Sequence, residues 1–183
     1  MRRLRFMLPG FIAAAALAAP GIAHAAECAG ADVHPSAADT ETVREATLCL
    51  LNNERTARGL PKLRPQPTLH RVSSSYARLM VRQGFFSHVS PGGSTLTQRI
   101  KRTGYLKGVR AWSVGENLAW GVGESATPRA IVAAWMDSPG HRANILSRSF
   151  REIGIGVTPG SPRIAGAAST AATYVTHFGM RKR

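Results

Sequence analysis

Apolar side chains recur at helical spacing in two stretches of the first half of the chain. The first stripe begins at Glu41 and stops at Gly59, and Pro61 prevents its continuation. The second stripe runs over residues 69–80 and stops at Gly84. Because apolar residues three and four positions apart share one face of a helix, each stripe predicts an amphipathic helix. Glycine and proline are the residues that commonly end helices, so they also set the two predicted boundaries.

In the second half of the chain the segments are shorter, and expected helices are interspersed with expected strands. Capping residues mark helix starts there, and alternating β-branched and aromatic residues mark strands. We expect a segment "PKLRPQPT" (61–68) without regular structure and a Gly- and Ala-rich hairpin connection over 159–172. The other expected elements are helices over 95–104, from Thr127 and from Ser138, and strands over 109–123, 151–160 and 170–180. This order predicts an α+β or a layered α/β domain.

The first 25 residues carry an export signal rather than part of the fold. Three early arginines precede an apolar run that ends in Ala23-His24-Ala25, which is the pattern of a secretory signal peptide. The run is too short and too interrupted by proline and glycine to form a stable spanning helix. In the mature chain we expect no transmembrane segment. We therefore expect a secreted, extracellular protein with a signal peptide (1–25), a flexible leader (26–40) and a single domain (41–183).

Composition narrows the partners only slightly. The 183-residue chain has a formal net charge of +14, and most of its basic residues are arginines scattered along the sequence. Arginine binds carboxylates and phosphates, so acidic polymers or anionic headgroups would adhere, but a solvated basic surface explains the same pattern. No specific nucleic-acid motif is present. Cys28 and Cys49 form an even pair in an exported chain, which indicates one disulfide rather than a metal site.

Three polar residues have apolar residues or glycines as their neighbours in the sequence, namely His88, Glu116 and His141. A buried carboxylate needs a partner, and two imidazoles would provide one. The same trio would make an open three-ligand site for a divalent metal such as zinc, or would perform general acid–base catalysis. His141 falls in the first turn of a helix, where the dipole favours neutral imidazole.

Each of the three residues also has a structural interpretation. In this interpretation His88 is an exposed loop residue and Glu116 is a strand residue bonded to backbone amides. His141 is then a residue of a helix cap. His177 and Asn144 are expected to be structural. The mature chain has neither a GxSxG nucleophile motif nor an HExxH zinc motif.

Five segments resemble a known family in their order. They are "CLLNNERTARGLPKLRPQPTL", "FFSHVSP", "VGENLAWG", "AWMDSPGHRANIL" and "EIGIGV". This series, within about residues 44–180, is similar to the bacterial short-form branch of the CAP superfamily, which includes cysteine-rich secretory, antigen 5 and pathogenesis-related proteins. The resemblance implies an α/β fold, a three-layer α-β-α sandwich of the CAP (SCP) type with a surface cleft.

The resemblance also assigns the cleft residues. His88, Glu116 and His141 match three of the four polar groups of the family's cleft. Ser138 stands at the second acidic position, which removes a negative charge that would help to hold a metal ion.

Members of this superfamily bind sterols, fatty acids or divalent metals, and a few are proteases. We therefore expect a ligand-binding module at the cell envelope or outside the cell, with a lipid, a cell-wall polymer or a protein as its partner. The alternative is a metal-dependent, protease-like hydrolase that uses His88, Glu116 and His141. Adhesion to anionic polymers by charge alone is a third hypothesis, and the sequence leaves open whether the protein is an enzyme.

Overall fold

The structure, a computed structural model, describes residues 27–36 and 40–182. The expected signal peptide, residues 1–25, lies outside the described residues. None of the described helices is long and apolar enough to span a membrane.

A four-stranded sheet forms the middle layer. Its strands are β1 (Arg64–Pro65), β2 (Ala111–Val122), β3 (Glu152–Pro159) and β4 (Ala171–Lys182), in the order β1-β3-β4-β2. β4 runs antiparallel to both β2 and β3, whereas β1 is parallel to β3. The hairpin expected between the last two strands is confirmed.

The two-residue strand β1 lies where no regular structure was expected. It pairs through Arg64 and Pro65, which lie opposite Glu152 and Ile153 of β3. Proline cannot donate a hydrogen bond to a sheet, so a sequence rich in proline does not look like a strand. The expectation for this segment was therefore wrong in this detail.

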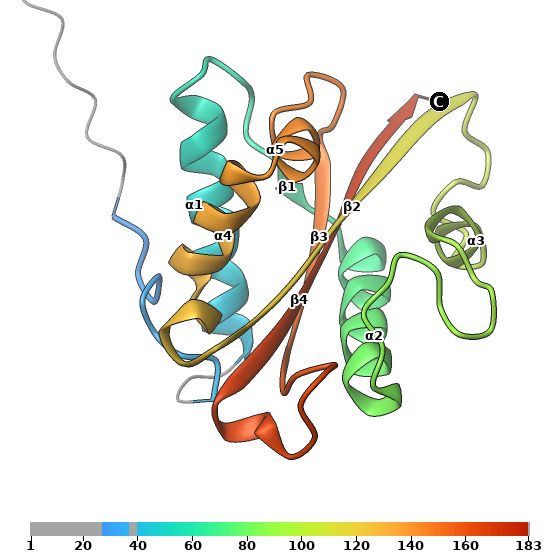
Figure 1. Ribbon diagram of the computed structural model, residues 1–183. Helices are drawn as coiled ribbons and strands as arrows, with labels where there is room; N and C mark the ends of the chain where they lie inside the picture. The colour runs from blue at the N-terminus through green and yellow to red at the C-terminus, as the bar shows by residue number, and fades with distance from the viewer. Residues whose placement is uncertain (1–26, 37–39, 183) are drawn as a thin grey trace, which may run out of the picture.

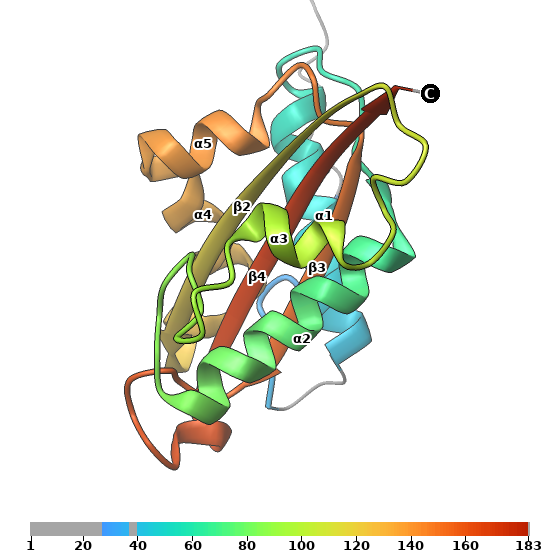
Figure 2. The same ribbon diagram turned by 90° about the vertical axis from the view of Figure 1, so that its right-hand side faces the viewer.

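Helices cover both faces of the sheet and complete three layers (Figure 1). α1 (Thr40–Thr56), α4 (Pro128–Asp137) and α5 (Pro139–Ile145) lie on one face. α2 (Pro67–Gln83) and α3 (Leu96–Lys101) lie on the other face, as the rotated view shows (Figure 2). The three-layer α-β-α sandwich is confirmed. Two short 3₁₀ turns, η1 (Gly123–Ala126) and η2 (Ala167–Ser169), precede α4 and β4.

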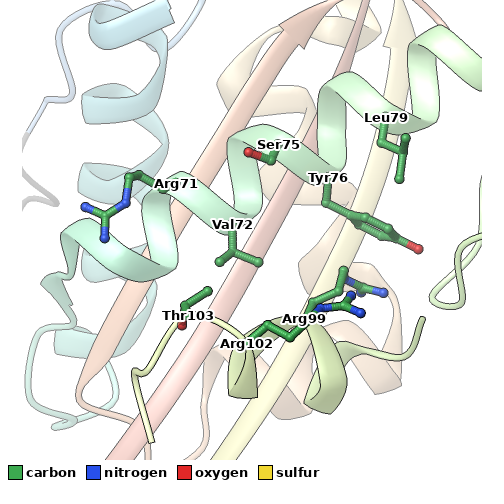
Figure 3. Close-up of a pocket in the computed structure, with 8 residues that line it drawn as sticks. All are labelled: Arg71, Val72, Ser75, Tyr76, Leu79, Arg99, Arg102 and Thr103. Carbon is green, nitrogen blue, oxygen red and sulfur yellow. The ribbon is translucent and has the colours of Figure 1, made fainter. Parts of the chain in front are cut away.

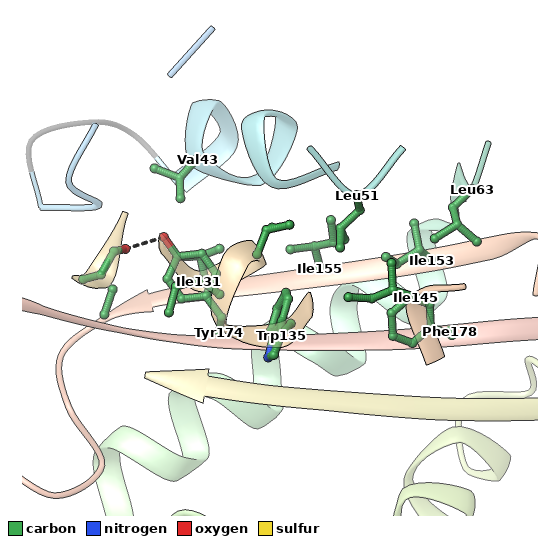
Figure 4. Packing of buried hydrophobic residues seen from close by; sticks show 14 of the residues in the cluster. Val43, Leu51, Leu63, Ile131, Trp135, Ile145, Ile153, Ile155, Tyr174 and Phe178 are labelled. Carbon is green, nitrogen blue, oxygen red and sulfur yellow. Dashed lines mark hydrogen bonds between the residues drawn. The ribbon is translucent and has the colours of Figure 1, made fainter. Parts of the chain in front are cut away.

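The main core fills the space between the sheet and the α1/α4/α5 layer (Figure 4). Trp135 of α4 packs edge-on against Tyr174 of β4, with ring centroids 6.5 Å apart. The Tyr174 hydroxyl donates to the Ala126 carbonyl at 2.7 Å, which satisfies its polar end within the core. The Trp135 indole donates to the Leu118 carbonyl of β2 at 3.1 Å. This side chain therefore covers part of the sheet as well as filling the core.

On the other face, two glycines of β3 let α2 lie directly on the sheet. A Cβ atom at Gly154 would stand 2.1 Å from the Leu69 carbonyl carbon, and one at Gly156 would stand 2.3 Å from that of Ser73. Atoms cannot approach so closely, so only glycine permits this packing. The close approach brings Ser73 of α2 against His177 of β4.

The N-terminal residues 27–36 contact the domain at several points. The expected Cys28–Cys49 disulfide is present and joins this segment to α1. Asp32 forms a bidentate ion pair with Arg129 of α4, with distances of 2.7 and 2.8 Å. The flexibility expected for leader residues 26–40 stays a prediction. The described part of this leader, residues 27–36, is held by these contacts.

Candidate functional site

Glu116 is the centre of a polar cluster between the sheet and the α2/α3 layer. It lies in the middle of β2, opposite His177 of β4 in the strand register. Its side chain is 2% exposed, and its Oε2 lies 2.7 Å from Nε2 of His177. A buried carboxylate must have partners, and this cross-strand histidine supplies the first of them.

Arg99 of α3 supplies the positive charge next to Glu116. Its Nη2 donates to Glu116 Oε2 at 2.6 Å, and its side chain is 8% exposed. Its Nη1 donates to the carbonyl oxygens of His88 and Ser94, at 3.1 and 2.7 Å. The guanidinium carbon also stacks 3.5 Å from the centre of the Tyr76 ring. Arg99 therefore joins the carboxylate to the loop that carries His88.

His88 is the part of the cluster that faces solvent. Its Nδ1 lies 2.7 Å from Glu116 Oε1, while 59% of its side chain is exposed. The Tyr76 hydroxyl donates to the neighbouring Ser87 carbonyl at 2.8 Å and fixes the loop. Because Glu116 accepts the Nδ1 proton, Nε2 is the nitrogen that points away from the carboxylate and can meet a ligand.

The electrostatics keep Glu116 ionised. Burial alone would raise its pKa, but hydrogen bonds from His177 and His88 and the charge of Arg99 lower the pKa to about 2. The hydrogen bond to Glu116 in turn raises the pKa of His88 above its ordinary value of 6.5, against the effects of burial and Arg99. The pair is thus a carboxylate that holds a solvent-facing imidazole in one orientation.

His177 belongs to the buried side of the same cluster. Its side chain is fully buried, and burial lowers its pKa although Glu116 acts in the opposite direction. Its Nδ1 lies 2.9 Å from the Ser73 hydroxyl. A neutral His177 donates from Nε2 to Glu116. Its Nδ1 faces the Ser73 hydroxyl, whose single proton also has the carbonyl oxygens of Leu69 and Gly154 within reach, at 2.9 and 3.0 Å.

His141 lies beside this cluster on α5. The Asn117 side chain donates to its carbonyl oxygen at 3.0 Å, and Asn144 donates to the Glu116 carbonyl at 3.2 Å. Burial lowers the pKa of the His141 imidazole, and the charge of His88 lowers it further. His88 and Glu116 are therefore in direct contact, whereas no described hydrogen bond joins the His141 imidazole to either. The bond to backbone expected for Asn144 is present, and the same nitrogen lies 2.8 Å from the Asn117 side-chain oxygen.

The donor set does not fit a metal centre that includes Glu116 as a ligand. Both carboxylate oxygens are already engaged, and Arg99 places a positive charge 2.6 Å from one of them. Within the described ranges, no group of three or more His, Cys, Asp or Glu side chains is placed to hold a metal ion. His88 and His141 remain as the two candidate imidazole ligands, and metal binding stays a prediction.

Sequence reasoning missed Arg99 as a partner of the site and gave His177 only a structural role. Arg99 looked like one of many scattered arginines, and only the fold turns it inward. A signal for His177 existed, because it interrupts an apolar strand just as Glu116 does. Ser138, at the position of the second acidic group, begins α5 without a hydrogen bond from its hydroxyl to the helix.

A match to a family model shows to which protein family the chain belongs. The model described as CAP, the cysteine-rich secretory protein family, matches residues 48–176. The chain belongs to this family. The match includes His88, Glu116 and His141 but ends just before His177.

Relatives and solved CAP structures agree with this assignment. The chain is 36% identical over 107 residues to the uncharacterized protein YkwD of Bacillus subtilis, a match that covers 58% of this chain and 39% of the relative. It thus spans about two fifths of that relative. An outer surface protein of Borrelia burgdorferi is similar with a TM-score of 0.64 and 23% identity, covering 79% of this chain and 97% of that one. An extracellular SCP-domain protein of Bacillus anthracis gives a TM-score of 0.58 and 25% identity, covering 79% and 44%.

Proposed function

We propose that this CAP-domain protein is a ligand-binding module that acts at the cell envelope or outside the cell, with His88 and His141 as its ligand-contacting residues. The observation that carries the proposal is the arrangement around Glu116. A buried, ionised carboxylate is held by three side chains, and it fixes the one exposed imidazole of the cluster. Fixing a side chain before the ligand arrives lowers the entropic cost of binding.

The two imidazoles offer complementary chemistry. His88, whose pKa is raised by Glu116, remains a hydrogen-bond donor at Nε2 over a wider pH range. His141, whose pKa is lowered by burial, stays neutral and offers an acceptor nitrogen. A polar group that both accepts and donates hydrogen bonds, such as a hydroxyl group of a lipid, cell-wall polymer or protein, fits this pair. The location outside the cell is supported by the predicted signal peptide and by the outer-surface and extracellular relatives.

A zinc titration tests whether the two imidazoles meet on one ligand. At pH 8 we expect calorimetry of the purified protein to show saturable binding of one zinc ion, since zinc binds neutral imidazole well. The double variant His88→Ala/His141→Ala should lose this binding. His34→Ala is the matched control and should keep it, because His34 contacts Ser36 and Thr170 instead.

Zinc binding that survives the double variant would place the ion elsewhere and contradict the site. No saturable binding to the original protein would exclude metal ligation by the two imidazoles. Glu116→Gln separates orientation from ligation. If Glu116 only orients His88, this variant should weaken zinc binding by about 10- to 100-fold rather than abolish it.

The hydrolase hypothesis is less well supported by the same contacts. Both oxygens of Glu116 are occupied by His88, His177 and Arg99, so its carboxylate is not placed to activate a metal-bound water. The alternative stays a prediction, and turnover that disappears in Glu116→Gln with the fold intact would favour it.

A further inference from the structure

A polar cavity lies beside β3, between the first turn of α1 and the middle of α2. Its volume is about 330 Å³, which falls at the lower end of the range for small-molecule sites. Among the described strands, none pairs with this edge of β3 beyond Ile153, where β1 ends. The cavity is lined mainly by polar side chains of the two helices, and Val157 of β3 completes it.

One face of α2 supplies most of the polar wall. Four of its residues line the cavity at positions i, i+3, i+4 and i+7, which lie on the same side of a helix, namely Arg71, Ser74, Ser75 and Arg78. The two arginines are thus about two turns apart, with two hydroxyl groups between them. Arg71 also borders the groove between α2 and α3, but Figure 3 shows it pointing away from Arg102, toward the side on which α1 lies.

The charge of the cavity wall is positive. Glu41 and Arg44, which line the cavity from α1, form an ion pair with each other. Among the ion pairs of the described residues, none includes Arg71 or Arg78, and their described side-chain hydrogen bonds go to hydroxyl groups. A guanidinium group has five N–H donors, so both arginines retain donors for a ligand. Two positive charges therefore face a ligand that enters this cavity.

His70 adds a fixed hydrogen-bonding group to the same cavity. Its Nδ1 lies 2.6 Å from the Ile155 carbonyl oxygen of β3. Because a carbonyl oxygen only accepts hydrogen bonds, Nδ1 carries the proton, and Nε2 of the neutral ring is an acceptor on the opposite side. The contact with β3 fixes the imidazole before a ligand arrives, which lowers the entropic cost of binding.

The lining favours a hydrophilic ligand. Val157 is the one hydrophobic residue among the described residues that line this cavity, and it is buried. The groove between α2 and α3 differs in this respect, because Val72, Tyr76 and Leu79 line it (Figure 3). A hydrocarbon chain would gain little from the polar cavity, whereas hydroxyl groups of a ligand would find hydrogen-bond partners there.

We propose that this cavity binds a sugar phosphate, a small molecule with many hydroxyl groups and one phosphate monoester. Arg71 and Arg78 bind the phosphate, since guanidinium groups hold phosphate oxygens through paired, charge-assisted hydrogen bonds. A phosphate monoester carries nearly two negative charges at neutral pH, which matches the two arginines. The sugar hydroxyls bind to Ser74, Ser75 and Nε2 of His70. The inference goes beyond the proposed function, because its residues are separate from His88 and His141.

Calorimetric titration of the purified protein with glucose 6-phosphate tests the proposal. We expect saturable binding of one molecule per chain at neutral pH. Inorganic phosphate should bind about tenfold more weakly, because it lacks the hydroxyl groups that two or three hydrogen bonds would hold. Glucose, which lacks the phosphate, should show no measurable binding. Glycerol 3-phosphate, with fewer hydroxyl groups, should bind with intermediate affinity.

Variants assign the site to this cavity. Arg71→Gln and Arg78→Gln should each weaken glucose 6-phosphate binding about tenfold, and the double variant should remove it. Arg102→Gln is the matched control, because Arg102 is also exposed and outside the described ion pairs but lines only the groove between α2 and α3. It should bind glucose 6-phosphate as the original protein does. Thermal melting of each variant verifies the fold.

A serine variant separates recognition of the sugar from recognition of the phosphate. Ser74→Ala should weaken the binding of glucose 6-phosphate about fivefold, through the loss of a hydrogen bond to a sugar hydroxyl. The same variant should leave the weaker binding of inorganic phosphate unchanged. An equal loss for both ligands would contradict the assignment of this hydroxyl to the sugar.

Four outcomes would overturn the proposal. They are no saturable binding of glucose 6-phosphate, equally tight binding of inorganic phosphate, binding that survives the double arginine variant, and an equal loss of binding in Arg102→Gln. Binding to phosphatidylglycerol vesicles without binding of glucose 6-phosphate would also overturn it and would assign the basic surface to a membrane. The His88→Ala/His141→Ala protein should bind glucose 6-phosphate normally, so failure of this proposal is distinguishable from failure of the proposed function.

Discussion

Glu116 and His177 face each other across β2 and β4, and their side chains meet at 2.7 Å inside the protein. His177 has no exposed surface, so its contribution is to hold the carboxylate rather than to meet a ligand. His88, on the other oxygen of Glu116, has most of its side chain in solvent. One buried carboxylate therefore connects a structural histidine to a surface histidine.

Replacing His177 by leucine should destabilise the fold at pH 7. The variant leaves Glu116 Oε2 with Arg99 alone and removes a hydrogen bond to a buried charge, so we expect a loss of about 2 kcal/mol in the free energy of unfolding. Urea unfolding measures it. Thr176→Val is the control on the same strand, because the Thr176 hydroxyl is buried without a partner and its removal should not destabilise. Equal losses in the two variants would contradict a specific role of the histidine.

The stability of the protein should fall in acid because of Glu116. Its pKa of about 2 in the folded state lies below the ordinary value of 4.5, so the unfolded chain binds the proton first as the pH falls. The stabilisation is complete above about pH 4.5 and is lost as the pH approaches 2, and its size is about 3 kcal/mol. Urea unfolding at several pH values should show a weaker acid dependence for Glu116→Gln than for the original protein. Glu54→Gln, in a surface ion pair with Arg58, should behave like the original, and a parallel curve for Glu116→Gln would refute the assignment.

The imidazoles of His88 and His141 should titrate in opposite directions from 6.5. NMR titration should give His88 a pKa above this value and His141 a pKa below it. In Glu116→Gln the pKa of His88 should fall, since the variant lacks the negative charge that stabilises imidazolium. In His88→Ala the pKa of His141 should rise. Glu152→Gln, which removes a carboxylate paired with Arg181, should leave His88 unchanged, and a similar shift there would indicate a general charge effect.

Local patterns in the sequence predicted most of the fold, but they predicted the candidate site only in part. The stripes over α1 and α2 and the alternating strands each predict their own element, because burial of one face is a property of the segment itself. The proline-rich strand β1 was missed because its pairing depends on β3. His88 and Glu116 were found by their apolar surroundings and by the family resemblance.

The partners of Glu116 depend on long-range contacts that no local pattern encodes. Arg99 lies 17 residues before Glu116 and His177 lies 61 residues after it, and the sheet register and the packing of α3 bring them together. A polar residue that interrupts an apolar strand is a signal that it has a buried partner. The sequence does not say which other polar residue supplies it.

The Cys28–Cys49 disulfide should stabilise the protein through the unfolded chain. It closes a loop with a sequence separation of 21 residues, for which the loss of chain entropy corresponds to about 3 kcal/mol. Thermal melting should therefore give a lower Tm for Cys28→Ser/Cys49→Ser, and for the original protein in the presence of a reductant. The two effects should be similar in size. A Tm that does not respond to either change would show that residues 27–36 add no stability through this bond.

Glycine at position 156 should be essential for the packing of α2 on the sheet. A Cβ atom there would stand 2.3 Å from the Ser73 carbonyl carbon, and this neighbour is backbone that cannot rotate away. Gly156→Ala should therefore push α2 outward, cost about 3 kcal/mol in urea unfolding, and change the NMR signals of His177, which lies against Ser73. Gly92→Ala is the control, because a Cβ there meets no atom within 4 Å, and it should leave both measurements unchanged. If Gly156→Ala is as stable as this control, α2 can shift freely, and the contact between Ser73 and His177 does not depend on the glycine.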